Sequence, residues 1–270
     1  MSRAWPAIAV FLWSLSAAAP WAQSSQARSL LDLGRLAQLG GDTVGAIEQY
    51  RAALAVNPDY GPALAGLGEC FFRLEEYNGY IWTAHNRFPT NTPGWWGGAH
   101  PFTLLEWSVV HNGEITSYGV NRNYLEMFGY ECTLKTDTEV ISYLFDLFVR
   151  EQKMSLEDTC TVLSPPLWEA IEGMPDENAK RKILHLRQYY PQALLNGPFA
   201  ILVSNGKEMV AMNDNLKLRP LVAARRGDQF FFSSEECSFE IVCKDREKTW
   251  MLKGGTPEIV RMKEGRRDAA

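Results

Sequence analysis

Apolar residues recur at every third or fourth position in the early part of the chain, which predicts helices there. Residues 27–58 and 61–74 follow this spacing, as one buried face of an α-helix requires. Pro58 ends the second predicted helix, because proline lacks the N–H group that a helix interior needs. Small residues among the apolar ones would let two antiparallel helices approach closely. We therefore expect a helical hairpin followed by one further helix.

From residue 77 onward, the apolar residues form short strand-like runs instead. Two such runs, in residues 77–88 and 104–115, end in polar residues, which is typical of strands that lead into turns. Residues 136–152 return to helical spacing, with a predicted buried face of Val140, Ile141, Leu144, Phe145 and Phe148. The remaining pattern predicts helices over 155–190 and hairpins over 197–214 and 220–236. This order of strands, helices and strands indicates an α+β fold with packed sheets and outer helices.

Residues 1–26 differ from both parts. Arg3 precedes an uncharged, mostly apolar run from Ala4 to Ala19, and small residues and a polar stretch follow. This order is typical of a secretory signal peptide, and we expect cleavage after Ala22. An uncleaved membrane anchor is the alternative, although the run is near the lower length limit for spanning and contains proline. The segment predicts an exported protein, periplasmic or secreted.

The predicted helices of residues 27–75 contain an internal repeat. Three pairs of residues are 34 positions apart: Leu30 and Leu64, Leu33 and Leu67, and Gly34 and Gly68. With Ala46, Tyr50 and Pro58 at helix-packing intervals, the segment resembles a tetratricopeptide repeat, whose period is 34 residues. Such repeats need stacked neighbours, and here one unit is followed by a single helix. We favour a helical spacer over a groove that binds a peptide partner.

Charge and cysteine usage narrow the classes of function. The net charge of −5 argues against a nucleic-acid surface, which would show a basic excess. The five cysteines, at 70, 132, 160, 237 and 243, form no CxxC pair, and their spacing matches no zinc pattern. We expect each to be a small buried apolar residue. The four histidines are also too far apart for a helical metal motif, so the sequence predicts neither a metal nor a bound cofactor.

Several separated motifs occur in an order that a known family shares. They are "HNRFPTN" (85–91), "HNGEI" (111–115), "TDTEV" (136–140), "NDNLKLRPLV" (213–222) and "FFFSSEE" (230–236). Together they resemble the class II glutamine amidotransferase domain, in the glutamate-synthase-like branch of the N-terminal-nucleophile hydrolases. The resemblance implies an αββα sandwich over residues 76–262, truncated at its N-terminus. The tetratricopeptide-like hairpin precedes it, and residues 263–270 form a polar tail.

The resemblance also implies how the substrate glutamine would be held. Arg87 would hold the α-carboxylate, since a guanidinium binds a carboxylate through two parallel hydrogen bonds. Thr90 and Asn91, in the same turn, would help to position the substrate. Asp137, at the start of its predicted helix, would pair with the α-ammonium group. Taken singly, Arg87 would be a surface arginine and Asp137 a helix cap.

Cleavage of an amide passes through a tetrahedral oxyanion, which needs donors already in place. By resemblance, these donors would be the Asn112 side chain and the Gly113 N–H group. On its own, the same pair would be a hairpin turn. His100 and His111 are interpreted as structural residues, and no role is assigned to them.

The nucleophile of the family is the feature that this sequence lacks. In the family it is a cysteine at the start of the mature chain, and its own α-amino group serves as the base. Cys70 is the only cysteine upstream of the arginine motif, and its flanks are those of a repeat helix. The intact family hydrolyses glutamine to glutamate and ammonia for a partner, here a flavin- and iron–sulfur-containing glutamate-synthase-like subunit. We expect this chain to be inactive or very weak as a glutaminase.

A non-enzymatic interpretation stays open beside this one. The chain would then be an exported adaptor that binds a peptide through the repeat, or an amino acid such as glutamine without cutting it. The two interpretations differ in location, since the family resemblance implies the cytoplasm and residues 1–26 imply export.

Overall fold

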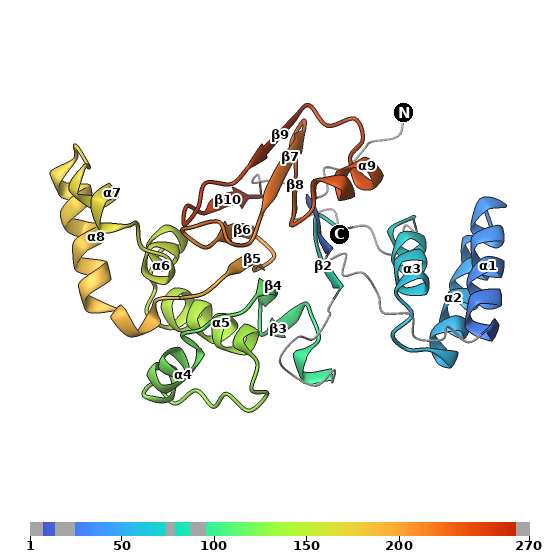
Figure 1. Cartoon of the computed structure of the whole chain (residues 1–270), viewed down its shortest axis with the longest axis horizontal. Helices are drawn as coiled ribbons and strands as arrows, with labels where there is room; N and C mark the ends of the chain where they lie inside the picture. The colour runs from blue at the N-terminus through green and yellow to red at the C-terminus, as the bar shows by residue number, and fades with distance from the viewer. Residues whose placement is uncertain (1–7, 14–24, 74–78, 87–95, 263–270) are drawn as a thin grey trace. The chain divides into compact units, whose positions relative to one another are not determined.

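The structure is a computed structural model, which describes residues 8–13, 25–73, 79–86 and 96–262 (Figure 1). The chain divides into two compact units. The helical unit is Leu15–Gly79, and the sheet unit combines Met1–Ser14 with Tyr80–Ala270. Across the part of the chain that is described, no helix has both the length and the apolar character needed to cross a membrane.

The helical unit consists of α1 (Ser25–Leu39), α2 (Thr43–Val56) and α3 (Gly61–Arg73). Tyr50 of α2 lies at its centre and is 1% exposed. Its ring fits between two glycines: a Cβ atom added at Gly34 or at Gly66 would meet the ring at 2.5 Å. The Tyr50 hydroxyl donates a hydrogen bond to Gln38 Oε1 at 2.6 Å. Because Gly34 and Gly66 have no side chains, the ring of Tyr50 fits between the two helices.

The expected hairpin and third helix are present, but the two predicted repeat positions differ in their surroundings. Gly34 lies against Tyr50, whereas a Cβ atom at Gly68 would meet nothing within 4 Å. In this unit α3 packs against α2 through Ala63 and Cys70, which are fully buried. The assignment to the tetratricopeptide repeats stays a prediction.

The sheet unit contains helices and short turns beside its two sheets. They are α4 (Tyr118–Glu126), α5 (Asp137–Phe145), α6 (Leu156–Leu163), α7 (Trp168–Glu172), α8 (Glu177–Tyr189) and α9 (Phe239–Val242), with the shorter turns η2 (Trp96–Gly98), η3 (Asp146–Glu151), η4 (Pro191–Ala193) and η5 (Glu236–Ser238). The helix predicted over 136–152 is α5 continued by the π-helical turn η3. All five residues of its predicted face are fully buried, which confirms the helical pattern.

The first sheet has the strand order β2-β1-β8-β7-β9. Its strands are β1 (Ile8–Trp13), β2 (Ile81–Asn86), β7 (Val222–Arg226), β8 (Gln229–Ser233) and β9 (Lys248–Met251). β1 lies between β2 and β8 and runs parallel to both. Part of the segment interpreted as a signal peptide is therefore a strand of this sheet. Since a strand in the folded chain neither requires nor forbids later cleavage, the signal peptide stays a prediction.

The second sheet has the order β10-β6-β5-β4-β3 and is antiparallel throughout. Its strands are β3 (Phe102–Leu104), β4 (Trp107–Gly113), β5 (Phe199–Ser204), β6 (Glu208–Asn213) and β10 (Glu258–Arg261). Both predicted hairpins are present, as β5–β6 and β7–β8, with Gly206 and Gly227 at positive φ in their turns. That conformation suits glycine, which has no Cβ atom.

The two faces of the second sheet bury different cores. On one face, Val109, Ile201 and Met212 pack with α5, η3 and α6. On the other face, Val110, Ala200 and Ala211 pack with Phe232 of β8 and with Leu221, the residue before β7. Successive residues of a strand point to opposite faces, so one strand can serve both cores. Figure 1 shows α4, α5 and α6 on one side of β4–β6 and strands β7–β9 on the other.

A short helical layer covers the outer face of the first sheet. Phe239 of α9 is 1% exposed and packs with Val222, Ala224 and Phe231. Within the described residues, the order is thus helices, sheet, sheet and short helices. This mixed α/β layering agrees with the sandwich expected from the sequence.

Candidate functional site

The end of β4 presents two neighbouring polar residues to opposite faces of the second sheet. His111 pairs with Ile201 and therefore faces the helices, while Asn112 pairs with Ala200 and faces the space between the sheets. His111 is 4% exposed, and Asn112 is half-buried. The alternation of the strand thus places the predicted oxyanion donor between the two sheets.

Gly113 ends β4 in a conformation that only glycine adopts easily. Its φ is +149°, and a Cβ atom there would lie 2.1 Å from the carbonyl oxygen of Pro198. The next residue, Glu114, donates its N–H to that same oxygen at 2.9 Å. The missing side chain lets the backbones of β4 and β5 stay in contact while the chain turns away from the sheet.

Asp137, the first residue of α5, joins this strand end to the helix. Its Oδ2 accepts a hydrogen bond from the Ile115 N–H at 3.1 Å. Its Oδ1 lies 3.4 Å from Nδ1 of His111. The side chain keeps 21% of its surface exposed.

A second histidine supports the same helix start. The ring of His100 lies with its Nε2 at 2.8 Å from Oγ1 of Thr138, which is the residue after Asp137. His85 of β2 is a neighbour of His100, with ring centroids 4.5 Å apart. Three histidines from separate segments thus gather around the start of α5.

The carboxyl of Asp137 is ionised across the neutral and mildly acidic range. Burial by itself raises the pKa of a carboxyl group. In Asp137 this effect is outweighed by the imidazole of His111, the N–H of Ile115 and the ring of His100, and together they lower the pKa from 3.8 to about 2. A fixed, partly exposed anion suits a substrate ammonium group.

The structure brings together three of the six predicted site residues. Asn112, Gly113 and Asp137 lie where the end of β4 meets the start of α5. The other three, Arg87, Thr90 and Asn91, lie outside the described residues, and their roles stay predictions.

Sequence reasoning missed the contribution of His111, which it had interpreted as structural without a role. No local pattern signals its contact with Asp137, because that contact depends on how α5 packs on the end of β4.

Four of the five cysteines are buried, as predicted, and none of these four has the character of a nucleophile. Burial raises the pKa of the Cys132 thiol to about 11 and that of Cys160 to about 12, and a reactive cysteine needs the opposite shift. Cys70 is fully buried in the core of the helical unit. Cys237 is exposed, which corrects the prediction for that residue.

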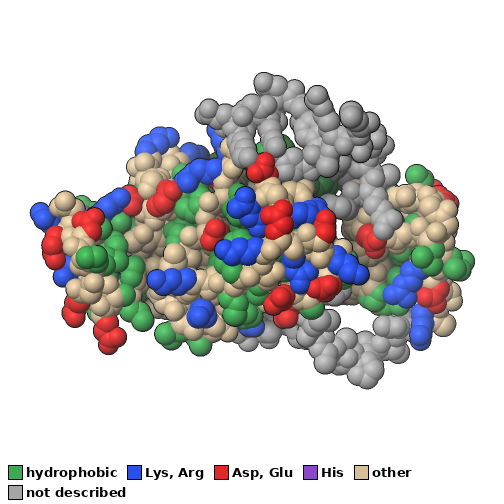
Figure 2. Space-filling view, turned by 90° about the horizontal axis from the view of Figure 1, so that it is seen from above, with side chains coloured by type: hydrophobic (Ala, Val, Ile, Leu, Met, Phe, Trp, Pro, Cys, Tyr) green, Lys and Arg blue, Asp and Glu red, His purple; other side chains and the backbone are tan. Residues whose placement is uncertain are grey.

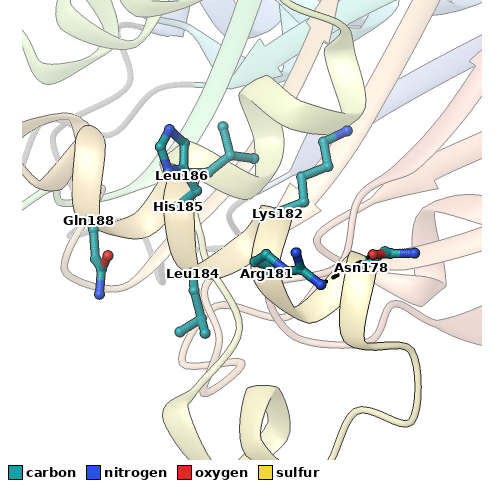
Figure 3. Close-up of a pocket in the computed structure, with 7 residues that line it drawn as sticks. All are labelled: Asn178, Arg181, Lys182, Leu184, His185, Leu186 and Gln188. Atoms are coloured by element: carbon teal, nitrogen blue, oxygen red, sulfur yellow. Dashed lines mark hydrogen bonds between the residues drawn. The ribbon is translucent and has the colours of Figure 1, made fainter.

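The pocket in Figure 3 is lined by seven residues that all belong to α8, among them Asn178, Arg181 and His185. One helix surface does not surround a ligand, because binding sites are concave and close on several sides. Within the described residues, no group of acidic, histidine or cysteine side chains could hold a metal ion.

Charged side chains of both signs mix on the face that Figure 2 shows. Ion pairs among the described residues include Arg246 with Glu240 and Arg226 with Asp245, both at 2.6 Å. A nucleic-acid surface would collect one sign of charge, and the exclusion of nucleic acid stays a prediction from composition.

With this geometry in place, comparison with known proteins decides the family. Residues 71–267 match the profile of the glutamine amidotransferases of class II. The chain belongs to this family. An uncharacterized protein of Archaeoglobus fulgidus is 50% identical over 204 residues, which cover 76% of this chain and 54% of that protein. This chain thus spans about half the length of that relative.

Two further relatives carry names that describe them. The large chain of glutamate synthase [NADPH] from Bacillus subtilis is 28% identical over 200 residues, covering 67% of this chain and 13% of that one. Among solved structures, a glutamine aminotransferase class-II domain protein from Silicibacter pomeroyi is 14% identical and gives a TM-score of 0.35, over 62% of this chain and 71% of that one.

Proposed function

We propose that this amidotransferase domain binds free glutamine at the junction of β4 and α5. One observation carries the proposal: the Asp137 carboxylate is fixed by the Ile115 N–H and by His111 at the end of the strand that carries Asn112 and Gly113, and its side chain keeps 21% of its surface exposed. A free amino acid carries an ammonium group that needs such an anion. Membership in the family supplies glutamine as the amino acid.

The remaining contacts of the substrate are assigned by the family pattern. Asn112 faces the space between the sheets and supplies a side-chain N–H₂ group at the end of β4, where the substrate amide would lie. Gly113 would add its backbone N–H, and Arg87 would take the α-carboxylate, assisted by Thr90 and Asn91. Each group of the amino acid then meets one partner of complementary charge or hydrogen bonding.

By resemblance, the hydrolytic step requires an N-terminal cysteine, and we propose that none of the five cysteines of this chain serves as that nucleophile. Four cysteines are buried, and Cys237, the exposed one, lies in η5 beside the short outer helices rather than between the sheets. We therefore propose binding without turnover by this polypeptide alone. A glutamate-synthase-like subunit would be the consumer of ammonia in a protein that retains the nucleophile, and the relative from Bacillus subtilis supports this class of partner.

An assay of glutamine-dependent ammonia release tests the loss of hydrolysis. We expect the purified chain to release no ammonia above the rate of a sample without protein. Release that Arg87→Ala abolishes would contradict the proposal, because it would show a working catalytic site. Release that Arg87→Ala leaves unchanged would point to a contaminating glutaminase, since Arg87 is the expected holder of the substrate carboxylate.

A further inference from the structure

A second asparagine lies level with Asn112 on the same face of the second sheet. Asn112 of β4 pairs with Ala200 of β5, and Ala200 pairs with Asn213 of β6. Residues in register across neighbouring strands point to the same face. That face looks toward the first sheet, since Val110, Ala200 and Ala211 all pack there. Two carboxamides thus flank the methyl group of one alanine in the space between the sheets.

Asn213 is the more buried of the two and holds an unused acceptor. Its side chain is 1% exposed, and its Nδ2 donates to the backbone oxygen of Arg219 at 3.1 Å. This bond identifies the Nδ2 and Oδ1 atoms of the Asn213 carboxamide. The backbone oxygen of Arg219 can only accept a hydrogen bond, so the atom that faces it must be the donor Nδ2. The Oδ1 atom is buried and has no hydrogen-bond partner within the described residues. An unpaired buried acceptor is costly to a fold.

The separation of the two asparagines matches one primary amide. Two strand spacings place their backbones about 10 Å apart. A hydrogen bond from Asn112 to an amide oxygen, the amide group itself, and a hydrogen bond from its nitrogen to Asn213 together span about 8 Å. An amide bound to both asparagines therefore requires their side chains to lean toward each other across Ala200. Ala200 is 0% exposed and Asn213 is 1% exposed, so the amide reaches this place only when the side chains that cover Ala200 move aside.

We infer that Asn213 is a specificity-determining residue whose Oδ1 accepts a hydrogen bond from the side-chain N–H₂ group of glutamine. This inference rests on the proposed function, because it concerns the same ligand. Asn112 donates a hydrogen bond to the carbonyl oxygen of the ligand amide, and Asn213 accepts one from its nitrogen. The pair therefore contacts both polar atoms of the amide group. A ligand with the same carbonyl but no N–H leaves the buried Oδ1 unpaired, which is how a polar site rejects a near-isostere.

Glutamate γ-methyl ester is the probe that isolates this contact. It is neutral at the side chain, keeps the carbonyl oxygen and has no N–H to donate. Calorimetric titration of the full chain with glutamine and with the ester gives the ratio of the two dissociation constants. We expect the wild-type chain to prefer glutamine by about tenfold or more, as one lost hydrogen bond to a buried group implies.

Substitutions at Asn213 are expected to remove this preference. In Asn213→Ala and Asn213→Ser, the ratio of dissociation constants falls to about threefold or less, because neither side chain carries an acceptor as far as Oδ1. Asn215→Ala is the matched control: Asn215 lies in the same loop and donates its Nδ2 to the Pro165 oxygen at 3.0 Å, so it loses a similar bond but keeps the full preference. Thermal unfolding of each variant separates loss of structure from loss of specificity.

The possible outcomes are distinguishable. A wild-type chain that binds ester and glutamine equally overturns the role of Asn213 while leaving the glutamine site in place. A folded Asn213→Ala that keeps the wild-type preference does the same. A wild-type chain that binds neither ligand overturns the glutamine site and this inference together.

Discussion

At the scale of single residues, Gly113 is the position where the site constrains the sequence most strongly. Its φ of +149° and the close Pro198 oxygen leave no room for a side chain. We expect Gly113→Ala to lower the free energy of unfolding by at least about 2 kcal/mol, measured by urea denaturation. Gly119→Ala is the control, because a Cβ atom there meets nothing within 4 Å in α4. An equal loss in both variants would contradict this account of Gly113.

Asp137 links the site to the stability of the fold through pH. Its pKa is lowered from 3.8 to about 2 in the folded chain, so the ionised form stabilises the fold above about pH 4, and that contribution is lost as the pH falls toward 2. The shift corresponds to about 2 kcal/mol. We therefore expect Asp137→Asn to be less stable than wild type by about this amount at pH 6 and nearly equal to it near pH 2.

Denaturant unfolding of both proteins at several pH values measures this difference. A loss of stability in Asp137→Asn that stays constant from pH 6 to pH 2 would show that the carboxylate charge is not the cause. The titratable groups that contact or face Asp137 among the described residues are His111 and His100, and His85 lies beside His100.

At the scale of elements, the fit of Tyr50 between two helices explains why the helical unit holds together. In Gly34→Ala, the new Cβ atom would lie 2.5 Å from the ring, and Gly66 on the other side leaves the ring no space to move. We expect a loss of about 1–3 kcal/mol from overpacking. Gly68→Ala, in open space on α3, should instead be neutral or stabilising by up to about 1 kcal/mol.

Protection of the α1–α3 amides from hydrogen exchange tests this prediction directly. Protection should fall in Gly34→Ala and stay or rise in Gly68→Ala. Equal protection in wild type and Gly34→Ala would mean that the close packing of the ring is not what stabilises the unit.

The elements themselves were predictable where their patterns were long. The helix at 136–152 and the two hairpins followed from apolar spacing and from Asn205-Gly206 and Arg226-Gly227. The site was predictable only through motif order: no local pattern says that Asp137 meets Ile115, because that contact depends on how α5 packs on the end of β4. Asn213 could not be predicted at all, since its alignment with Asn112 depends on the register of β4, β5 and β6.

At the scale of the whole molecule, residues 8–13 carry two interpretations. Their apolar run predicts a signal peptide, and in the folded chain the same residues form β1, which pairs with β2 and β8. Cleavage after Ala22 would remove β1 and leave unpaired backbone groups on β2 and β8, which sheets generally avoid. Export of the mature chain therefore stays a prediction. It requires that the backbone groups of β2 and β8 find other hydrogen-bond partners after β1 is removed.

The central claim is that the junction of β4 and α5 binds glutamine, and calorimetric titration tests it most directly. We expect saturable binding of glutamine to the wild-type chain, and binding about tenfold or more weaker in Asp137→Asn, since the ammonium group loses its anion. Glu126→Gln removes an exposed carboxylate that pairs with Arg122 on α4 and should bind glutamine as wild type does. No binding by the wild-type chain, or equal binding by wild type and Asp137→Asn, would contradict the claim.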